Sequence, residues 1–198
     1  MKIVIATGNK GKFEEFAQAF EPFDLDVVSA AEMGIVDFPE ESGNNYQENA
    51  LIKANFVCKE TGLMALGDDS GLEVAALNNE PGLFSARYGG ISDSLKRNDY
   101  LLSKLKGVND REAKFVAVLA LARPELPFVS FRAEAKGRII DEGSGKEGFG
   151  YDPIFYSYDL KKTFAEAKRR EKQGVSHRGK AISQLVGFLK HEYPAVFL

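Results

Sequence analysis

Two neighbouring carboxylates, Asp68 and Asp69, are the residues of this chain that most clearly suggest chemistry. They follow the apolar residues 64–66, which predict the end of a buried strand, and they precede Ser70 and Gly71. Adjacent carboxylates repel each other, and a divalent cation or a proton shared with a substrate water would relieve that repulsion. Asp, Ser and Gly are also ordinary turn residues. Taken alone, the stretch therefore fits a polar turn as well as a catalytic site.

A glycine-containing turn near the N-terminus predicts an anion cradle. Residues 3–6 form a short apolar run typical of a buried strand, and apolar side chains recur at helical spacing over 13–20. The turn between them consists of Thr7, Gly8, Asn9, Lys10, Gly11 and Lys12. Backbone N–H groups at a helix start, the helix dipole and two lysines would attract phosphate. The spacing is not that of a Walker A loop, and the alternative is a plain turn with solvated lysines.

Lys53 lies at the edge of the apolar face of a helix predicted over 46–61. Asn49 precedes it by one helical turn on the same edge. A lysine in this position usually extends into water, but it could also point into a cleft and bind phosphate. The loop before the helix, residues 37–45, carries three carboxylates, and most such loops are simply solvated surface.

A second glycine-rich loop, residues 143–152, carries an aromatic ring with little local packing. Phe149 stands between Gly148 and Gly150, so its ring could stack on a nucleotide base or fold back onto the core. The following segment, 161–180, is rich in Lys and Arg, which usually indicates a solvated helix face. Further strands are predicted over 25–29, 115–121, 128–136 and 153–156, with helices over 95–105 and from about 181 onward.

Composition limits the class of protein. The chain has 198 residues, 44% hydrophobic and 28% charged, which fits one domain or one domain with two lobes. A net charge of −3 gives no global basic field for nucleic acid, and no apolar run is long enough for a membrane span. We expect no signal peptide, and a single cysteine, Cys58, fits the cytoplasm. Because there are only two histidines, a bound metal should be an oxygen-liganded ion such as Mg²⁺.

Four blocks of this sequence, taken together, resemble the inosine/xanthosine triphosphate pyrophosphatases, which hydrolyse damaged purine nucleoside triphosphates. The blocks stand in the family's order across nearly the whole chain, and we find no departure within them. They are Ala6-Thr7-Gly8-Asn9 with Lys12, Glu48-Asn49-Ala50 with Lys53-Ala54, Asp68-Asp69-Ser70-Gly71-Leu72 with Ser85-Ala86-Arg87-Tyr88, and Gly148-Phe149-Gly150-Tyr151-Asp152-Pro153 with Ser176-His177-Arg178-Gly179.

The resemblance implies an α/β fold with an elongated mixed sheet and two lobes around a central nucleotide cleft, all within one domain over 1–198. It also implies a cytoplasmic homodimer that depends on Mg²⁺ and releases a nucleoside monophosphate with pyrophosphate. Asp69 would be the proton acceptor and a metal ligand, and Glu40 the second metal carboxylate, although its neighbour Glu41 leaves that register open. The implied substrate-binding residues are Thr7, Gly8, Asn9, Lys10, Gly11, Lys12, Lys53, Ser70, Phe149, Gly150, Tyr151, Asp152, Lys172, His177 and Arg178.

The residue types agree with this chemistry. Lysines with Mg²⁺ would neutralise the leaving pyrophosphate, and a carboxylate within reach would polarise the attacking water. His177 and Arg178 would donate to a 6-keto oxygen and Asp152 would accept from the ring N1–H, which favours inosine and xanthosine triphosphates over adenosine triphosphate. The covalent alternative through Ser70 is weaker, because no histidine adjoins it in sequence. The competing classes are a nucleotide-activating transferase or general phosphatase, and an RNA-binding protein that uses residues 161–180.

Overall fold

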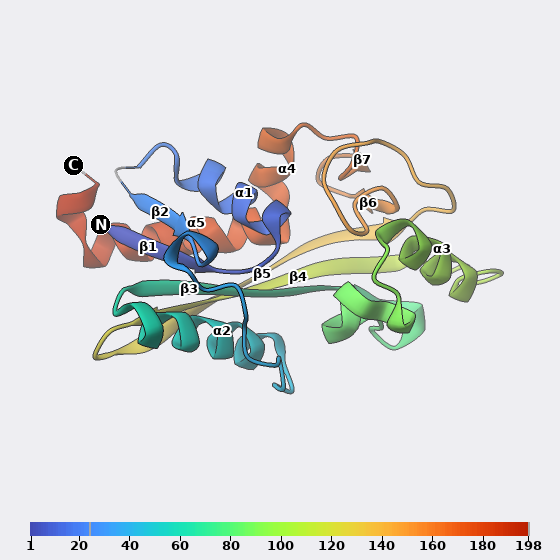
Figure 1. Ribbon diagram of the computed structural model, residues 1–198. Coiled ribbons are helices and arrows are strands. Elements are labelled where there is room, and N and C mark those ends of the chain that lie inside the picture. Colours follow the sequence, from blue (N-terminus) through green and yellow to red (C-terminus); the bar gives the residue numbers. More distant parts are fainter. Residues whose placement is uncertain (24, 198) are drawn as a thin grey trace. The chain divides into compact units, whose positions relative to one another are not determined.

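The computed structural model describes residues 1–23 and 25–197, and Figure 1 shows its helices and strands. The chain forms two compact units. Unit 1 comprises residues 1–69, 117–133 and 178–198, and unit 2 comprises residues 70–116 and 134–177, with residues 24 and 198 outside the description. The boundary falls between Asp69 and Ser70, so the stretch that opened the sequence analysis supplies residues to both units.

The strands of the described residues form one seven-stranded sheet in the order β2-β1-β3-β4-β5-β6-β7. Their bounds are β1 Lys2–Ala6, β2 Asp26–Ser29, β3 Met64–Val74, β4 Glu112–Arg123, β5 Leu126–Ile139, β6 Phe155–Ser157 and β7 Lys162–Thr163. Strand β1 is parallel to both β2 and β3, whereas β6 is antiparallel to both β5 and β7. The sheet is therefore mixed, as predicted.

In unit 1, helices cover both faces of the parallel strands. These are α1 (Lys10–Phe20) and α5 (His177–Glu192) on one face and α2 (Tyr46–Thr61) on the other (Figure 1). Ile3 and Ile5 of β1 share a buried cluster with α1 and α5, while Val4 packs in a cluster with α2. Successive strand residues point to opposite faces, so a strand buried on both faces is apolar at every position. That explains the continuous apolar run at 3–6.

Unit 2 has its own core. It contains α3 (Ser94–Lys104) and α4 (Arg169–Val175), and a buried cluster that joins the second half of β3 to β6 and the loop before it. The 3-10 helix η1 (Ala31–Met33) follows β2 in unit 1. Two more, η2 (Ala75–Leu77) and η3 (Gly82–Gly90), follow β3 in unit 2. The last, η4 (Pro194–Val196), follows α5 in unit 1. Within the described residues, no helix is long and apolar enough to cross a membrane.

Helix α2 has the bounds that the sequence predicted, because both of its ends are encoded locally. The side chain of Asn45 accepts a hydrogen bond from the backbone N–H of Glu48, and Gly62 ends the helix with a left-handed φ of 66°. Two other helices begin earlier than predicted. Lys10 to Lys12 form the first turn of α1, and α5 begins at His177.

The prediction of a strand end at Asp68 and Asp69 was wrong, and so was the alternative of a polar turn. Strand β3 continues through both carboxylates to Val74. Gly67 permits this because it lies against α2, where an added Cβ would approach the carbonyl oxygen of Ala50 to 1.9 Å. The strand can bury its carboxylates because side chains from other elements bind them.

Candidate active site

The turn after β1 positions Lys12 so that its side chain reaches β3. The backbone N–H of Asn9 donates to Thr7 Oγ1 (3.1 Å), and Asn9 Oδ1 caps α1 by accepting from the backbone N–H of Lys12 (3.0 Å). Lys12 then reaches Asp68, with 2.5 Å between its Nζ and Oδ1. Burial lowers the pKa of the Lys12 ammonium despite this ion pair. A cation held at a helix start with little solvent is suited to binding phosphate.

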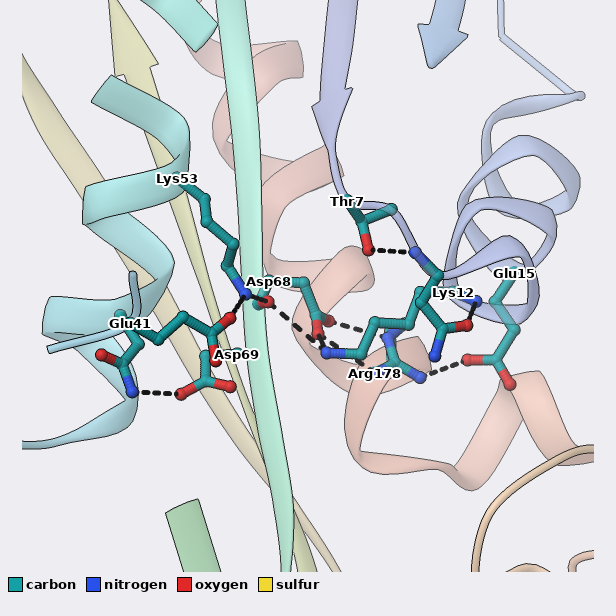
Figure 2. A network of polar contacts seen from close by, with 10 residues as sticks. Thr7, Lys12, Glu15, Glu41, Lys53, Asp68, Asp69 and Arg178 are labelled. Carbon is teal, nitrogen blue, oxygen red and sulfur yellow. Dashed lines mark hydrogen bonds and ion pairs between the residues drawn. The ribbon is translucent and has the colours of Figure 1, made fainter. Parts of the chain in front are cut away.

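Asp68 is a fully buried carboxylate bound by two cations (Figure 2). Besides Lys12, it accepts from Arg178 through Nε to Oδ2 (2.7 Å) and through Nη2 to Oδ1 (3.2 Å). The third guanidinium nitrogen of Arg178, Nη1, lies 2.6 Å from Oε2 of Glu15. Burial alone would raise the pKa of Asp68, but the charges of Arg178 and Lys12 outweigh it and hold this pKa well below its usual range.

Lys53 points inward rather than into water. Its side chain is 9% exposed, and its Nζ donates to the main-chain oxygen of Asp68 (2.7 Å) and to Glu41 Oε1 (2.5 Å). The solvated alternative for this lysine is therefore excluded. Asp68 thus binds both lysines: its carboxylate pairs with Lys12, and its main-chain carbonyl accepts from Lys53.

Asp69 has different surroundings from Asp68, as Figure 2 shows. Its Oδ2 accepts from Asn49 Nδ2 (3.1 Å), and Asn49 Oδ1 in turn accepts from the backbone N–H of Gly43. Burial raises the pKa of Asp69, and Glu41 adds to that effect, while Lys12 and Lys53 act against it. A buried carboxyl with a raised pKa is a stronger base than an ordinary aspartate, which suits proton abstraction.

The site contains two carboxylates of the kind that could bind Mg²⁺. Glu41 and Asp69 interact electrostatically and offer hard oxygen donors. Among residues 1–23 and 25–197, no three or more His, Cys, Asp or Glu side chains cluster as a metal site. Mg²⁺ commonly takes one or two carboxylates and completes its coordination with water and substrate phosphates, so a pair suffices. The carboxylate that interacts with Asp69 is Glu41, and metal binding by Glu40 stays a prediction.

Unit 2 holds the second group of predicted residues. Asp152 Oδ2 accepts from Lys172 Nζ (2.7 Å) and from the backbone N–H of Phe149 (2.8 Å). The ammonium of Lys172 lies 5.0 Å from the centre of the Phe149 ring. His177 is buried and stacks on Phe115, with 4.7 Å between ring centroids. The usual reading of 161–180 as a solvated helix face does not hold at Lys172, which is 5% exposed.

The predicted residues divide between the two units. Unit 1 contains Thr7, Gly8, Asn9, Lys10, Gly11, Lys12, Glu40, Lys53, Asp69 and Arg178, and unit 2 contains Ser70, Phe149, Gly150, Tyr151, Asp152, Lys172 and His177. The side chain of Lys10 is 91% exposed, and it forms an ion pair with Glu14 over 4.0 Å.

Sequence reasoning missed one member of the unit 1 network, Glu15, and one pairing, that of Arg178 with Asp68. Glu15 binds Arg178 from the second turn of α1, one helical turn after Lys12, and that spacing was the only available signal. The pairing of Arg178 with Asp68 joins residues 110 positions apart and has no local signal.

Comparison with known proteins shows which family the chain belongs to. The profile of the Ham1 family matches residues 3–188. The chain belongs to the Ham1 family. The Ham1 protein of Staphylococcus aureus has a solved structure that covers 97% of this chain and all of its own, with a TM-score of 0.87 and 40% identity. The HAM1 protein of Coxiella burnetii is similar at 39% identity and the same TM-score, over 96% of this chain and 99% of its own. These neighbours confirm the α/β fold.

A Ham1 relative from Thermus thermophilus is 45% identical over 98% of this chain and 94% of its own length, and is named dITP/XTP pyrophosphatase. Relatives from Deinococcus deserti and Staphylococcus aureus bear the same name, each at 42% identity. The resemblance proposed from the four sequence blocks is therefore confirmed.

Proposed function

We propose that this chain hydrolyses deaminated purine nucleoside triphosphates, namely ITP, dITP and XTP, to a nucleoside monophosphate and pyrophosphate. Membership of the Ham1 family and relatives named dITP/XTP pyrophosphatase support the reaction class. The structural observation that carries the proposal is the convergence of Lys12 and Lys53 on Asp68, directly beside the buried Asp69.

The two lysines stabilise the leaving group. Negative charge accumulates on the β-phosphate as the bond between the α-phosphorus and the bridging oxygen breaks. Lys12 and Lys53 are held without substrate by Asp68 and Glu41, so they are already oriented when phosphate arrives. Their ammonium groups then need less side-chain ordering to bind the pyrophosphate oxygens than solvated lysines would.

Asp69 takes the proton of the attacking water. The water oxygen bonds to the α-phosphorus, its proton passes to the Asp69 carboxylate, and pyrophosphate leaves with the electron pair of the broken bond. The raised pKa of Asp69 makes this transfer more favourable than it would be to an exposed aspartate. Asn49 holds one carboxylate oxygen through a hydrogen bond and so orients the other.

Glu41 and Asp69 would hold Mg²⁺, which supplies charge neutralisation on the phosphates when it is bound. The neighbouring glutamates allow a matched test of this assignment. Glu41→Gln should raise the Mg²⁺ concentration that gives half-maximal activity by about tenfold, the effect of losing one ligand interaction of about 1.4 kcal/mol. If Glu40→Gln causes that shift and Glu41→Gln does not, the register predicted from the sequence is the correct one.

Base selection rests on donors and a stacking ring. Phe149 stacks on any base, so discrimination comes from His177 and Arg178, which donate to the 6-keto oxygen. Arg178 binds Asp68 and Glu15 in the described structure, so a contact with the base requires one of its nitrogens to change partner. Arg178→Lys keeps the charge that Asp68 needs but loses the fork of donors, and should reduce the preference for ITP over ATP.

The deciding experiment resolves the products of a panel of nucleoside triphosphates with and without Mg²⁺. We expect pyrophosphate and monophosphate in one step, fastest for ITP and XTP and only with Mg²⁺, with no further splitting of free pyrophosphate. Stepwise release of orthophosphate would instead identify a general phosphatase, and transfer of the nucleotide to an acceptor would identify a transferase. RNA binding that weakens steeply with salt, without hydrolysis, would favour the RNA-binding alternative.

The resemblance also supports a homodimer and a cytoplasmic location as proposals. Light scattering on the purified chain should give twice the mass of one chain. A mass equal to one chain at micromolar concentration would contradict the dimer.

A further inference from the structure

The loop that carries Phe149 is held by side chains as well as by its own backbone, in which the N–H of Asp152 donates to the carbonyl oxygen of Phe149 (3.2 Å). Gly148 and Gly150 both adopt the left-handed region, with φ of 75° and 63°. An added Cβ on Gly148 would lie 2.0 Å from Asp152 Oδ2. Phe149 itself is only half-buried, so the position of its ring depends on what fixes the backbone on either side of it.

One fixed point of this loop lies within the predicted site. Asp152 Oδ2 accepts from both the backbone N–H of Phe149 and the ammonium of Lys172. This carboxylate is 2% exposed, and it therefore acts on the loop from inside the protein.

The other fixed point comes from α3, which the sequence analysis assigned no function. Asn98 Nδ2 donates to the carbonyl oxygen of Gly150 over 3.1 Å. Asn98 is 5% exposed. Its side-chain amide contacts a loop residue that lies 52 positions further along the chain. Because a buried amide without a partner is unfavourable, this bond fixes both the asparagine and the loop.

Arg97, the residue before Asn98, contacts the next residue of the same loop. Arg97 donates through Nη1 to the carbonyl oxygens of Ile91 (3.0 Å) and Ser92 (2.9 Å), and its guanidinium lies 5.5 Å from the centre of the Tyr151 ring. The hydroxyl of Tyr151 donates to the carbonyl oxygen of Ser85 (3.0 Å). The start of α3 thus holds both residues that follow Phe149.

We propose that Asn98 is a positioning residue for base recognition: its hydrogen bond to Gly150 sets where the Phe149 ring lies, and so decides how well a purine stacks. This inference rests on the proposed function, because it assigns the Phe149 ring to the nucleotide base. Asn98 acts through the loop and does not itself contact the substrate.

The kinetic test removes the donor in two ways. Asn98→Leu keeps the volume and loses both polar atoms, and Asn98→Asp keeps the shape and replaces the donor with an acceptor. Both variants should raise KM for ITP about tenfold and lower the preference for ITP over ATP, the effect of one lost hydrogen bond, while kcat stays near that of wild type. Ser103→Ala is the matched control, because the Ser103 hydroxyl bonds only within α3, to Tyr100, among the contacts described.

A second readout does not depend on activity. The chain contains no tryptophan, so Phe149→Trp introduces a single tryptophan at the loop, which can be excited selectively over the tyrosines. Adding Asn98→Leu or Asn98→Asp to that variant should increase acrylamide quenching and lower the fluorescence anisotropy, whereas adding Ser103→Ala should change neither. This measurement succeeds or fails whether or not the chain hydrolyses any triphosphate, so it separates an error in the positioning inference from an error in the proposed function.

Unchanged quenching in both Asn98 variants would overturn the inference. So would a change in kcat with constant KM and constant ITP preference, since that pattern indicates a general structural role. If Asn98→Leu does not fold, the isosteric Asn98→Asp still decides between these outcomes.

Discussion

Asp68 and Asp69 are neighbours on β3, yet the pKa values of their carboxyl groups are shifted in opposite directions. Around Asp68, two cations and two hydrogen bonds from Arg178 neutralise a fully buried carboxylate. Around Asp69, the neutral amide of Asn49 donates, Glu41 adds negative charge, and the charges of Lys12 and Lys53 do not fully offset the effect of burial. The pKa of Asp68 is consequently held well below its usual range, and that of Asp69 is raised.

Burial alone therefore does not decide what a carboxylate does. Adjacent residues of a strand point to opposite sides, so each samples a separate environment. A buried carboxylate whose oxygens are bound by cations holds other groups in place, whereas one whose pKa is raised by burial is poised to accept a proton. On this account Asp68 organises the site and Asp69 performs the chemistry.

The largest effect should come from breaking the Asp68 region. Asp68→Asn leaves Arg178 and Lys12 as buried cations without their carboxylate, and should lower the free energy of unfolding by about 3–5 kcal/mol. Urea denaturation measures this loss. A decrease below about 1 kcal/mol, the size found for exposed ion pairs, would show that the network is not structural.

Asp69→Asn should affect rate rather than stability. It removes the proton acceptor and should lower kcat/KM for ITP by about 10²-fold or more, equivalent to about 2.7 kcal/mol of transition-state stabilisation. The variant should be at least as stable as wild type, since it replaces a buried carboxylate of raised pKa with a neutral amide. A variant that unfolds more easily than wild type would place Asp69 among the structural residues instead.

Substitution of Lys12 and Lys53 tests whether the lysines held by Asp68 contribute to catalysis. Lys12→Met and Lys53→Met retain an unbranched apolar chain and lose the charge, and each should reduce kcat/KM for triphosphates by at least about tenfold. Lys59→Met supplies the control on α2, because Lys59 is exposed and outside the network. Wild-type kinetics in Lys53→Met would mean that this lysine serves only to pair with Glu41.

The smallest effects are pH dependences of opposite sign. The depressed pKa of Asp68 means that its stabilising contribution is complete above about pH 3.9, the pKa in an unfolded chain, and is lost as pH falls through the lower folded value. The raised pKa of Asp69 means that its carboxylate opposes folding above the folded pKa, and that this penalty is relieved as pH falls through that pKa.

Two pH series measure these contributions. The stability advantage of Asp69→Asn over wild type should shrink as pH falls toward about 3.9. Both proteins are measured without Mg²⁺, because a bound cation would lower the pKa of Asp69. An advantage that grows on acidification would reverse the sign assigned to Asp69.

Local signals explain what the sequence could predict. Helix α2 was predicted with its correct bounds because Asn45 caps its start and Gly62 its end. The first strand was predicted because Ile3, Val4 and Ile5 are all apolar, as a strand covered on both faces requires.

Contacts distant in sequence explain what it could not predict. Asp, Ser and Gly disfavour strands, so no local pattern shows that β3 passes through Asp68 and Asp69. The strand is possible there because Arg178, from the far end of the chain, supplies the compensating charge. For the same reason, Asn98 gave no signal as a residue of the Phe149 loop.

The most direct test of the account compares Asp68→Asn and Asp69→Asn in one experiment, measuring pyrophosphate released from ITP per folded molecule. Unfolding curves of the same samples provide the folded fraction. We expect Asp69→Asn to be fully folded and to lose about 10²-fold or more in rate, and Asp68→Asn to be less stable but to lose less rate per folded molecule. Equal losses in both variants, or a larger loss in Asp68→Asn, would contradict the division between an organising and a reacting carboxylate.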